Sequence, residues 1–93
     1  MPSYTPPLRD MQFLLHEVFD AVSRLQAIPR YADVDADTVN AVLEGAGTFA
    51  AEVTQQMNLS GDQQGCTHDQ ASKTVTTPKG FKEAYKQFVE GGW

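Results

Sequence analysis

Apolar residues recur at three- and four-residue spacing in three stretches of this chain, and this periodicity constrains the fold more than any other feature. Such spacing places side chains on one face of an α-helix. The first stretch lies between two prolines, Pro7 and Pro29, and consists of Leu8, Met11, Leu14, Leu15, Val18, Phe19, Val22 and Leu25. Proline fits the first turn of a helix and interrupts its interior. We therefore expect one helix from Pro7 to Pro29, preceded by an extended arm over residues 1–7, which hold three prolines.

The second stretch follows a cluster of aspartates, of which Asp35 is the predicted helix cap. Its apolar residues continue with helical spacing as far as Asn58. Two glycines, Gly45 and Gly47, lie inside this pattern and together cost roughly 2 kcal/mol relative to alanine. That cost indicates close packing against a neighbouring helix.

The remaining third of the chain separates into a polar segment and a third amphipathic stretch. Residues 59–77 lack apolar periodicity and predict a long loop, in which residues 74–76 could be a very short extended piece. Thr77 and Pro78 form a typical helix start, and Gly91 and Gly92 a typical end. The apolar face between them consists of Phe81, Ala84, Tyr85, Phe88 and Val89. The expected fold is one all-α domain over residues 1–93, with about three amphipathic helices and a long loop between the second and the third.

Charge and hydropathy exclude several classes of partner. Twelve acidic residues against seven basic ones give a formal charge of −5, which disfavours nucleic acid and anionic membrane surfaces. No segment approaches the ~20 consecutive apolar residues of a membrane span, and the first residues lack the pattern of a secretory signal. The single Cys66 cannot form an internal disulfide. We expect a cytoplasmic protein.

Two short motifs invite a chemical interpretation. The run from Gly45 to Ala50 fits the spacing of a dinucleotide-binding fingerprint, but that motif needs a preceding strand, and the helical periodicity here favours a helix. Cys66, His68 and Asp69 group three possible metal ligands, or a thiol with a base. A zinc site needs four ligands, and nothing beside the thiol marks an oxyanion hole. A surface loop is the favoured interpretation of both the thiol and its neighbours.

The other titratable residues do not form a constellation. His16 lies at the edge of the first apolar stripe, and Glu44, Glu52 and Glu83 fall on predicted wet faces. We therefore assign no catalytic, no cofactor-binding and no metal-binding residue to this chain.

Three segments, in order, resemble the beginning of certain bacterial acyl-CoA dehydrogenases, in particular a branch of larger, long-chain enzymes. They are YTPPLRDMQFLL over residues 4–15, NLSGD over 58–62 with Gly65 and Cys66, and TPKGFKEAY over 77–85 with Gly92 and Trp93. The sequence departs from the resemblance at residues 54–57 and 70–73, which are more polar than expected.

The resemblance implies a subunit with an amino-terminal helical domain, a middle β-domain and a carboxy-terminal helical bundle, of which this chain would be a truncated first part. It implies that FAD binds between the later domains and that a glutamate of the carboxy-terminal part abstracts the α-proton of the acyl thioester. The parent would oxidise acyl-CoA to 2,3-enoyl-CoA, pass electrons to an electron-transfer flavoprotein and form a homo-oligomer. The 93-residue chain alone would be inactive and would pack on the remaining domains of the same polypeptide.

An alternative from a different class is a small helical interaction protein. Such a protein would bury the same apolar stripes in a homodimer or on a partner.

Overall fold

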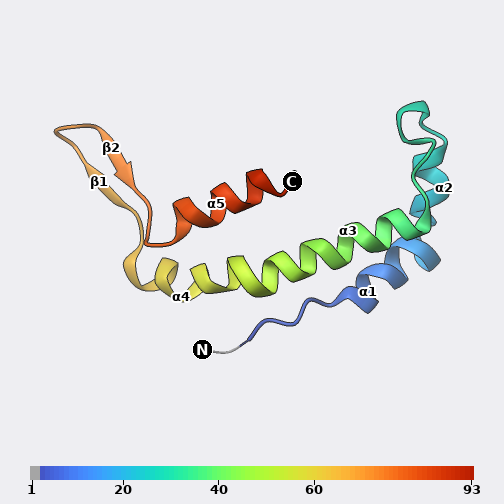
Figure 1. Ribbon diagram of the computed structural model, residues 1–93, viewed down its shortest axis with the longest axis horizontal. Helices are drawn as coiled ribbons and strands as arrows, with labels where there is room; N and C mark the ends of the chain where they lie inside the picture. The colour runs from blue at the N-terminus through green and yellow to red at the C-terminus, as the bar shows by residue number, and fades with distance from the viewer. Residues whose placement is uncertain (1–2) are drawn as a thin grey trace. The chain divides into compact units, whose positions relative to one another are not determined.

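The computed structural model describes residues 3–93, which are mostly helical but include a two-stranded antiparallel sheet (Figure 1). The expectation of an all-α fold is therefore confirmed only in its helical part. Met1 and Pro2 of the expected arm lie outside the described residues. The chain divides into two compact units, Thr5–Phe49 and, for the most part, Ala50–Trp93.

The Thr5–Phe49 unit begins with a short non-helical segment and continues through several short helices. Their bounds are α1 Leu8–Phe13, the π-helical turn η1 Leu14–Val18, α2 Ala21–Gln26, the 3-10 turn η2 Pro29–Tyr31 and α3 Ala36–Phe49. Pro7 directly precedes α1, and its carbonyl oxygen accepts a hydrogen bond from the Met11 amide at 3.1 Å.

The predicted single helix from Pro7 to Pro29 is wrong, because the backbone breaks at Asp20. Asp20 has φ 49°, in the left-handed region that aspartate tolerates better than most residues. Just before it, the Phe19 amide bonds to the Leu14 carbonyl oxygen at 2.9 Å, the five-residue spacing of a π-turn. Apolar spacing survives on both sides of the break, so periodicity alone did not reveal it.

The predicted cap of α3 is confirmed. The backbone N–H of Thr38 donates to Asp35 Oδ1 at 2.7 Å, which satisfies one of the free amides at the start of the helix. Hydrogen bonds from the Thr38 backbone and side chain hold the pKa of Asp35 below its ordinary value of 3.8.

One of the two glycines inside α3, Gly47, lies at a close approach, as the cost of glycine in a helix indicated. Gly47 is buried, and a Cβ at this position would lie 3.2 Å from Leu8 Cδ2 and 3.2 Å from Pro6 Cγ. Because Leu8 begins α1, this glycine allows α1 and the segment before it to lie against α3, as Figure 1 shows.

The Ala50–Trp93 unit contains the π-helical turn η3 Ala50–Thr54, α4 Gln55–Gln64, the strands β1 Thr67–Asp69 and β2 Thr74–Thr76, and α5 Phe81–Glu90. The predicted loop over residues 59–77 is wrong, except that its expected short extended piece at residues 74–76 is strand β2. Helix continues to Gln64 instead of ending at Asn58, and the next residues form a hairpin with the register Thr67 to Thr76, His68 to Val75 and Asp69 to Thr74. Tertiary contacts override the polar sequence here, since Ser60, Gly61 and Gln64 all contact the segment that leads into α5.

The third predicted helix exists but begins at Phe81, not at Pro78. Gly80 precedes it with φ 94°, a conformation that glycine adopts without a steric cost. The helix ends at Glu90 with Gly91 as its C-cap, which confirms the predicted stop at Gly91 and Gly92. Within residues 3–93, no helix has both the length and the apolar character needed to cross a membrane.

Candidate interaction surface

Most large apolar side chains of this chain remain accessible to solvent. Among residues 3–93 the buried hydrophobic core is a single residue, Ala84, which is 6% exposed. The exposed large apolar side chains are Tyr4, Phe13, Leu14, Val18, Phe19, Ile28, Tyr31, Val42, Leu59, Val75, Tyr85, Phe88, Val89 and Trp93. Both units contribute to this set, so neither unit buries its own apolar stripe.

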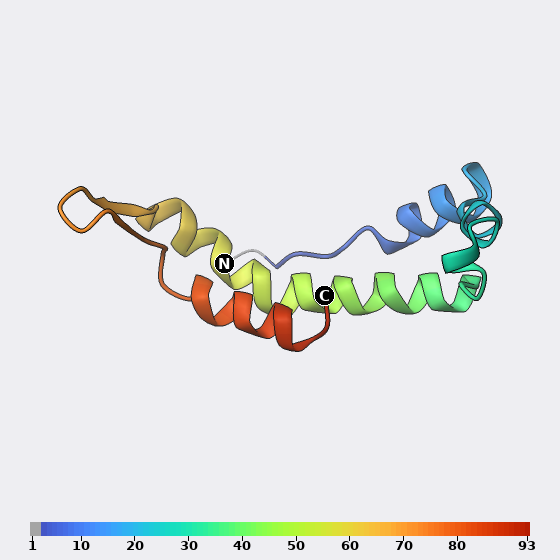
Figure 2. The ribbon, with the colours of Figure 1, turned by 90° about the horizontal axis from the view of Figure 1, so that it is seen from above.

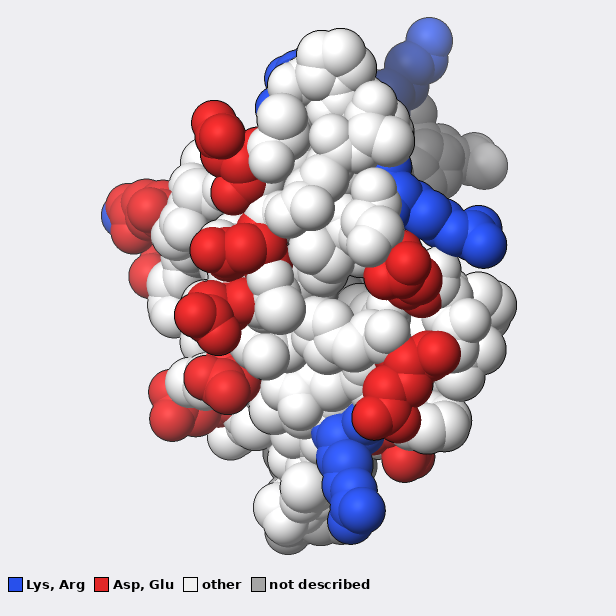
Figure 3. Space-filling model, turned by 90° about the vertical axis from the view of Figure 1, so that its right-hand side faces the viewer, with Lys and Arg blue, Asp and Glu red and all other residues white. Residues whose placement is uncertain are grey.

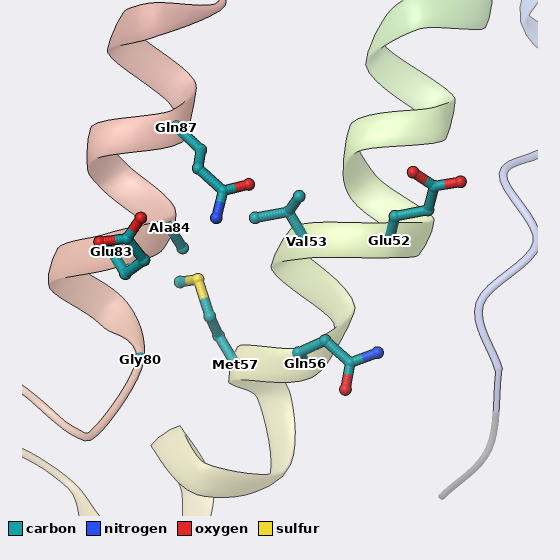
Figure 4. A pocket seen from close by; sticks show the side chains of 8 residues that line it. All are labelled: Glu52, Val53, Gln56, Met57, Gly80, Glu83, Ala84 and Gln87. Atoms are coloured by element: carbon teal, nitrogen blue, oxygen red, sulfur yellow. The ribbon is translucent and has the colours of Figure 1, made fainter.

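In the Ala50–Trp93 unit, the inner face of α5 packs against η3 and α4. Figure 4 shows Val53 and Met57 pointing toward α5, with Ala84 and Gln87 facing them. These side chains line an open hollow of about 240 Å³. Glu52 and Gln56 also line the hollow but point away from α5, so the two carboxylates of this region, Glu52 and Glu83, do not converge on one point.

Three contacts fix the start of α5 on α4. The Phe81 ring lies directly over Gly61, where an added Cβ would come within 2.9 Å of Phe81 Cζ. The Ser60 hydroxyl donates to the Lys79 carbonyl oxygen at 3.2 Å, and the Lys79 amide donates to Gln64 Oε1 at 2.9 Å. The segment between α4 and α5 therefore begins and ends at fixed points.

The outer face of α5 is an apolar stripe with charged flanks. Tyr85 is 68% exposed, and Val89, one turn later, is also exposed. The Tyr85 and Phe88 rings stack with centroids 6.3 Å apart. Lys82, Lys86 and Glu90 border the stripe, and Lys86 Nζ lies 4.0 Å from a Glu90 carboxylate oxygen. We call Tyr85, Phe88 and Val89 the α5 stripe.

The Thr5–Phe49 unit has its own exposed apolar residues on α1 and η1. Phe13, Leu14 and Val18 are exposed, and Phe13 borders a shallow hollow that is also lined by Arg9, Gln12, His16 and Glu17. His16 is held there by a hydrogen bond between its Nε2 and Asn40 Oδ1, 2.7 Å apart, which ties η1 to α3. This histidine is a half-buried structural residue in the geometry, as its place at the edge of the stripe suggested.

The residues singled out from the sequence do not form a reactive site. Residues 45–49 of the dinucleotide-like run belong to α3 and Ala50 to η3, and residues 3–44 contain no strand, so the helical interpretation is confirmed. Cys66 is an exposed free thiol, and His68 and Asp69 lie on the exposed strand β1. Over residues 3–93, no group of three or more His, Cys, Asp or Glu side chains is placed to hold a metal ion.

Sequence reasoning anticipated one strand of the hairpin, the short extended piece at residues 74–76, and missed the other strand, Thr67–Asp69. The signal of the anticipated strand was present in Thr74, Val75 and Thr76, whose β-branched side chains favour strands. Strand β1 gave no comparable signal, because Thr67, His68 and Asp69 read as loop residues.

Charge is distributed unevenly between the two units. Thr5–Phe49 contains seven acidic and three basic side chains, whereas Ala50–Trp93 contains five acidic and four basic ones. On the face shown in Figure 3, acidic groups lie on both the left and the right sides, and the basic groups do not gather into one patch. This face offers no basic patch for a phosphate backbone.

The geometry thus defines a helical module with accessible apolar faces and no assembled reactive site among its described residues. The sequence matches no established protein-family profile. It is 32% identical over 91 residues to 3-methylmercaptopropionyl-CoA dehydrogenase of Ruegeria pomeroyi (strain ATCC 700808 / DSM 15171 / DSS-3). The alignment covers 98% of this chain but 15% of that enzyme, so the chain spans less than a sixth of its relative's length.

Proposed function

We propose that this chain is the amino-terminal helical part of a flavin-dependent acyl-CoA dehydrogenase and that it packs on the remaining domains of the same polypeptide. The complete enzyme oxidises an acyl-CoA to its 2,3-enoyl-CoA and passes the electrons to an electron-transfer flavoprotein. The observation that carries the proposal is the similarity to an acyl-CoA dehydrogenase over 98% of the chain.

The exposed apolar faces support this role. A chain of this size folds alone only marginally, because it buries only about 60–65% of the surface that its unfolded form exposes. Among the residues that the structure describes, the buried hydrophobic core is Ala84 alone, while aromatic and aliphatic side chains on α1, η1 and α5 remain accessible. Apolar surface of this extent is typical of a protein interface. The aligned relative is much longer than this chain, so the remaining domains of a similar polypeptide are candidates to cover these apolar faces.

The dinucleotide-like run of this chain offers no cradle for the pyrophosphate of FAD. The run from Gly45 to Ala50, which matches a dinucleotide fingerprint in spacing, lies within α3 and η3. The backbone N–H groups inside a helix already donate to carbonyl oxygens of the preceding turn and cannot cradle a pyrophosphate. We therefore assign FAD, and with it the oxidative chemistry, to the other domains, and we place no catalytic residue on this chain.

The test compares the product of the complete reading frame with residues 1–93 alone. We expect the complete product to carry flavin absorbance and to convert an acyl-CoA to the enoyl-CoA in the presence of an electron acceptor. We expect the 93-residue chain to do neither. A complete product without flavin or dehydrogenase activity would contradict the proposal, and so would stoichiometric flavin binding by the short chain.

A second candidate is a helical interaction protein that buries the α5 stripe against a second copy. The exposure of Tyr85 and Val89 favours it. A reading frame that ends at Trp93 and a product that forms a discrete dimer, which Tyr85→Ser dissociates, would support this candidate over the dehydrogenase. The matched change Tyr31→Ser, at an exposed tyrosine outside α5, should leave such a dimer intact.

A further inference from the structure

The β1–β2 hairpin is a projection of the Ala50–Trp93 unit. It extends away from α4 and α5 in both views of the ribbon (Figures 1 and 2). Its two ends are fixed where Phe81 packs on Gly61 and where Ser60 and Gln64 hydrogen-bond to Lys79. The tip is also ordered by local bonds, since the Ala71 amide donates to Asp69 Oδ1 at 3.0 Å and the Ser72 and Thr74 hydroxyl oxygens lie 2.8 Å apart.

This projection lacks the support that a sheet of two strands requires. A two-stranded ribbon without a third strand or a helix against it is marginally stable in water. All six strand residues are exposed, and within residues 3–93 the sheet has no other strand. Contacts at the base and at the turn hold this ribbon in place, although the contacts between its own two strands stabilise it weakly. A strand added to one edge would therefore find the ribbon already in an extended conformation.

The two outer edges of the ribbon differ. Proteins protect free strand edges with charged residues, and β1 carries His68 and Asp69. Strand β2 carries Thr74, Val75 and Thr76, which are β-branched and uncharged, and Val75 is 63% exposed. The free edge of β2 is therefore the edge that lacks protection and fits a strand partner.

We propose that the free edge of β2 pairs with a β-strand from the part of the polypeptide that lies outside these 93 residues, so that the hairpin extends a sheet of that part. This proposal rests on the proposed function, because the aligned relative is several times longer than this chain and so supplies the additional protein. Main-chain hydrogen bonds would give the pairing its stability, and Val75 would provide the apolar contact on the face of the sheet.

The test is amide hydrogen exchange in the complete polypeptide, resolved to single amides of the hairpin. In the ribbon alone, the outward-pointing amides of both strands exchange freely. With a third strand on β2, the outward amides of residues 74–76 should exchange about tenfold more slowly or better, while those of residues 67–69 stay fast. Fast exchange at the outward amides of both strands would overturn the proposal.

A matched pair of variants separates edge pairing from simple coverage of one face. Val75 and His68 are directly opposed in the register, so Val75→Lys and His68→Lys add the same charge to the same face of the ribbon. We expect Val75→Lys to abolish the slow exchange at residues 74–76 and His68→Lys to leave it. Equal effects of the two variants, or none from either, would contradict pairing at β2.

Photo-crosslinking from position 75 identifies the occupant. With Val75 replaced by p-benzoylphenylalanine in the complete polypeptide, we expect crosslinks within one chain to an extended segment outside residues 1–93. Crosslinks that double the mass of the chain would assign the edge to a second copy and overturn the proposal. A complete polypeptide that is an active flavoprotein but has fast exchange at β2 would refute this inference alone, whereas protection at β2 without flavin or activity would refute the proposed function alone.

Discussion

In each unit of this chain, a glycine allows a helix to pack closely against a neighbouring segment, but the space at the two glycines differs. In Thr5–Phe49, α3 lies against the start of α1 at Gly47, where an added Cβ would lie 3.2 Å from Pro6 and Leu8 side-chain atoms. In Ala50–Trp93, α5 lies against α4 at Gly61, where the corresponding distance to the Phe81 ring is 2.9 Å. The first contact is to a non-helical segment and a flexible leucine, whereas the second is to a ring held between two helices. The Gly61 contact should therefore tolerate change less than the Gly47 contact.

The largest effect should come from removal of the ring at the tighter contact. Phe81→Ala takes away the side chain that covers Gly61, and because Phe81 is half-buried we expect a loss of about 2 kcal/mol, below the usual range for a fully buried phenylalanine. Denaturant unfolding or hydrogen exchange of the α5 amides measures it. The control is Tyr85→Ala on the outer face, which should change stability by no more than about 0.5 kcal/mol. Equal losses from the two variants would show that Phe81 does not anchor α5.

The next largest effect is the difference in stability between alanine substitutions at the two glycines. Gly61→Ala should cost about 1 kcal/mol, because overpacking against the Phe81 ring outweighs the gain in helix propensity. Gly47→Ala should be nearly neutral, since Leu8 can shift by a few tenths of an ångström and the propensity gain offsets the strain. Thermal unfolding of both variants gives the comparison. A larger loss at position 47 than at position 61 would reverse the ranking of the two contacts.

A smaller effect is expected from the polar tie between η1 and α3. Asn40→Ala removes the oxygen that bonds to His16 Nε2 and should cost about 0.5 kcal/mol, since the bond is partly exposed. The matched control is Asn58→Ala on the exposed surface of α4. The measurement is the exchange rate of the η1 amides, which should rise in the first variant only. An unchanged rate in Asn40→Ala would mean that packing alone holds η1.

The smallest effect concerns the cap of α3 and its pH dependence. The folded-state pKa of Asp35 is lowered by the Thr38 hydrogen bonds, so the contribution of this carboxylate is present above its ordinary pKa of 3.8 and is lost as the pH falls through the lower, folded value. A carboxyl NMR titration should show Asp35 titrating below its ordinary pKa of 3.8. Asp35→Ala should increase fraying at Ala36–Thr38 near neutral pH. A titration of Asp35 at or above its ordinary pKa would contradict the cap.

Sequence patterns predicted the features of this fold that depend on local chemistry. The Asp35 cap depends on one side chain and the next helical turn, and the apolar face of α5 depends on residues within ten positions of each other. Gly47 indicated a close approach because glycine destabilises a helix interior, and close packing against a neighbour offsets that loss.

Features that depend on distant residues were missed. The extension of α4 to Gln64 depends on Phe81, Lys79 and their contacts some fifteen to twenty residues later. The break at Asp20 leaves the apolar spacing intact on both sides. The hairpin pairs an obvious strand-forming segment with Thr67–Asp69, which has no strand signal of its own. The exposure of the α5 stripe could not be predicted from periodicity, which shows which face of a helix is apolar but not whether anything covers it.

The central claim is that protein outside these 93 residues covers the apolar faces of this chain. Sedimentation velocity of residues 1–93 over a range of micromolar concentrations tests it most directly, with the complete polypeptide as the comparison. We expect the short chain to self-associate with increasing concentration, whereas the complete polypeptide sediments as a defined species. A short chain that sediments as a compact monomer at every concentration and unfolds cooperatively would contradict the claim.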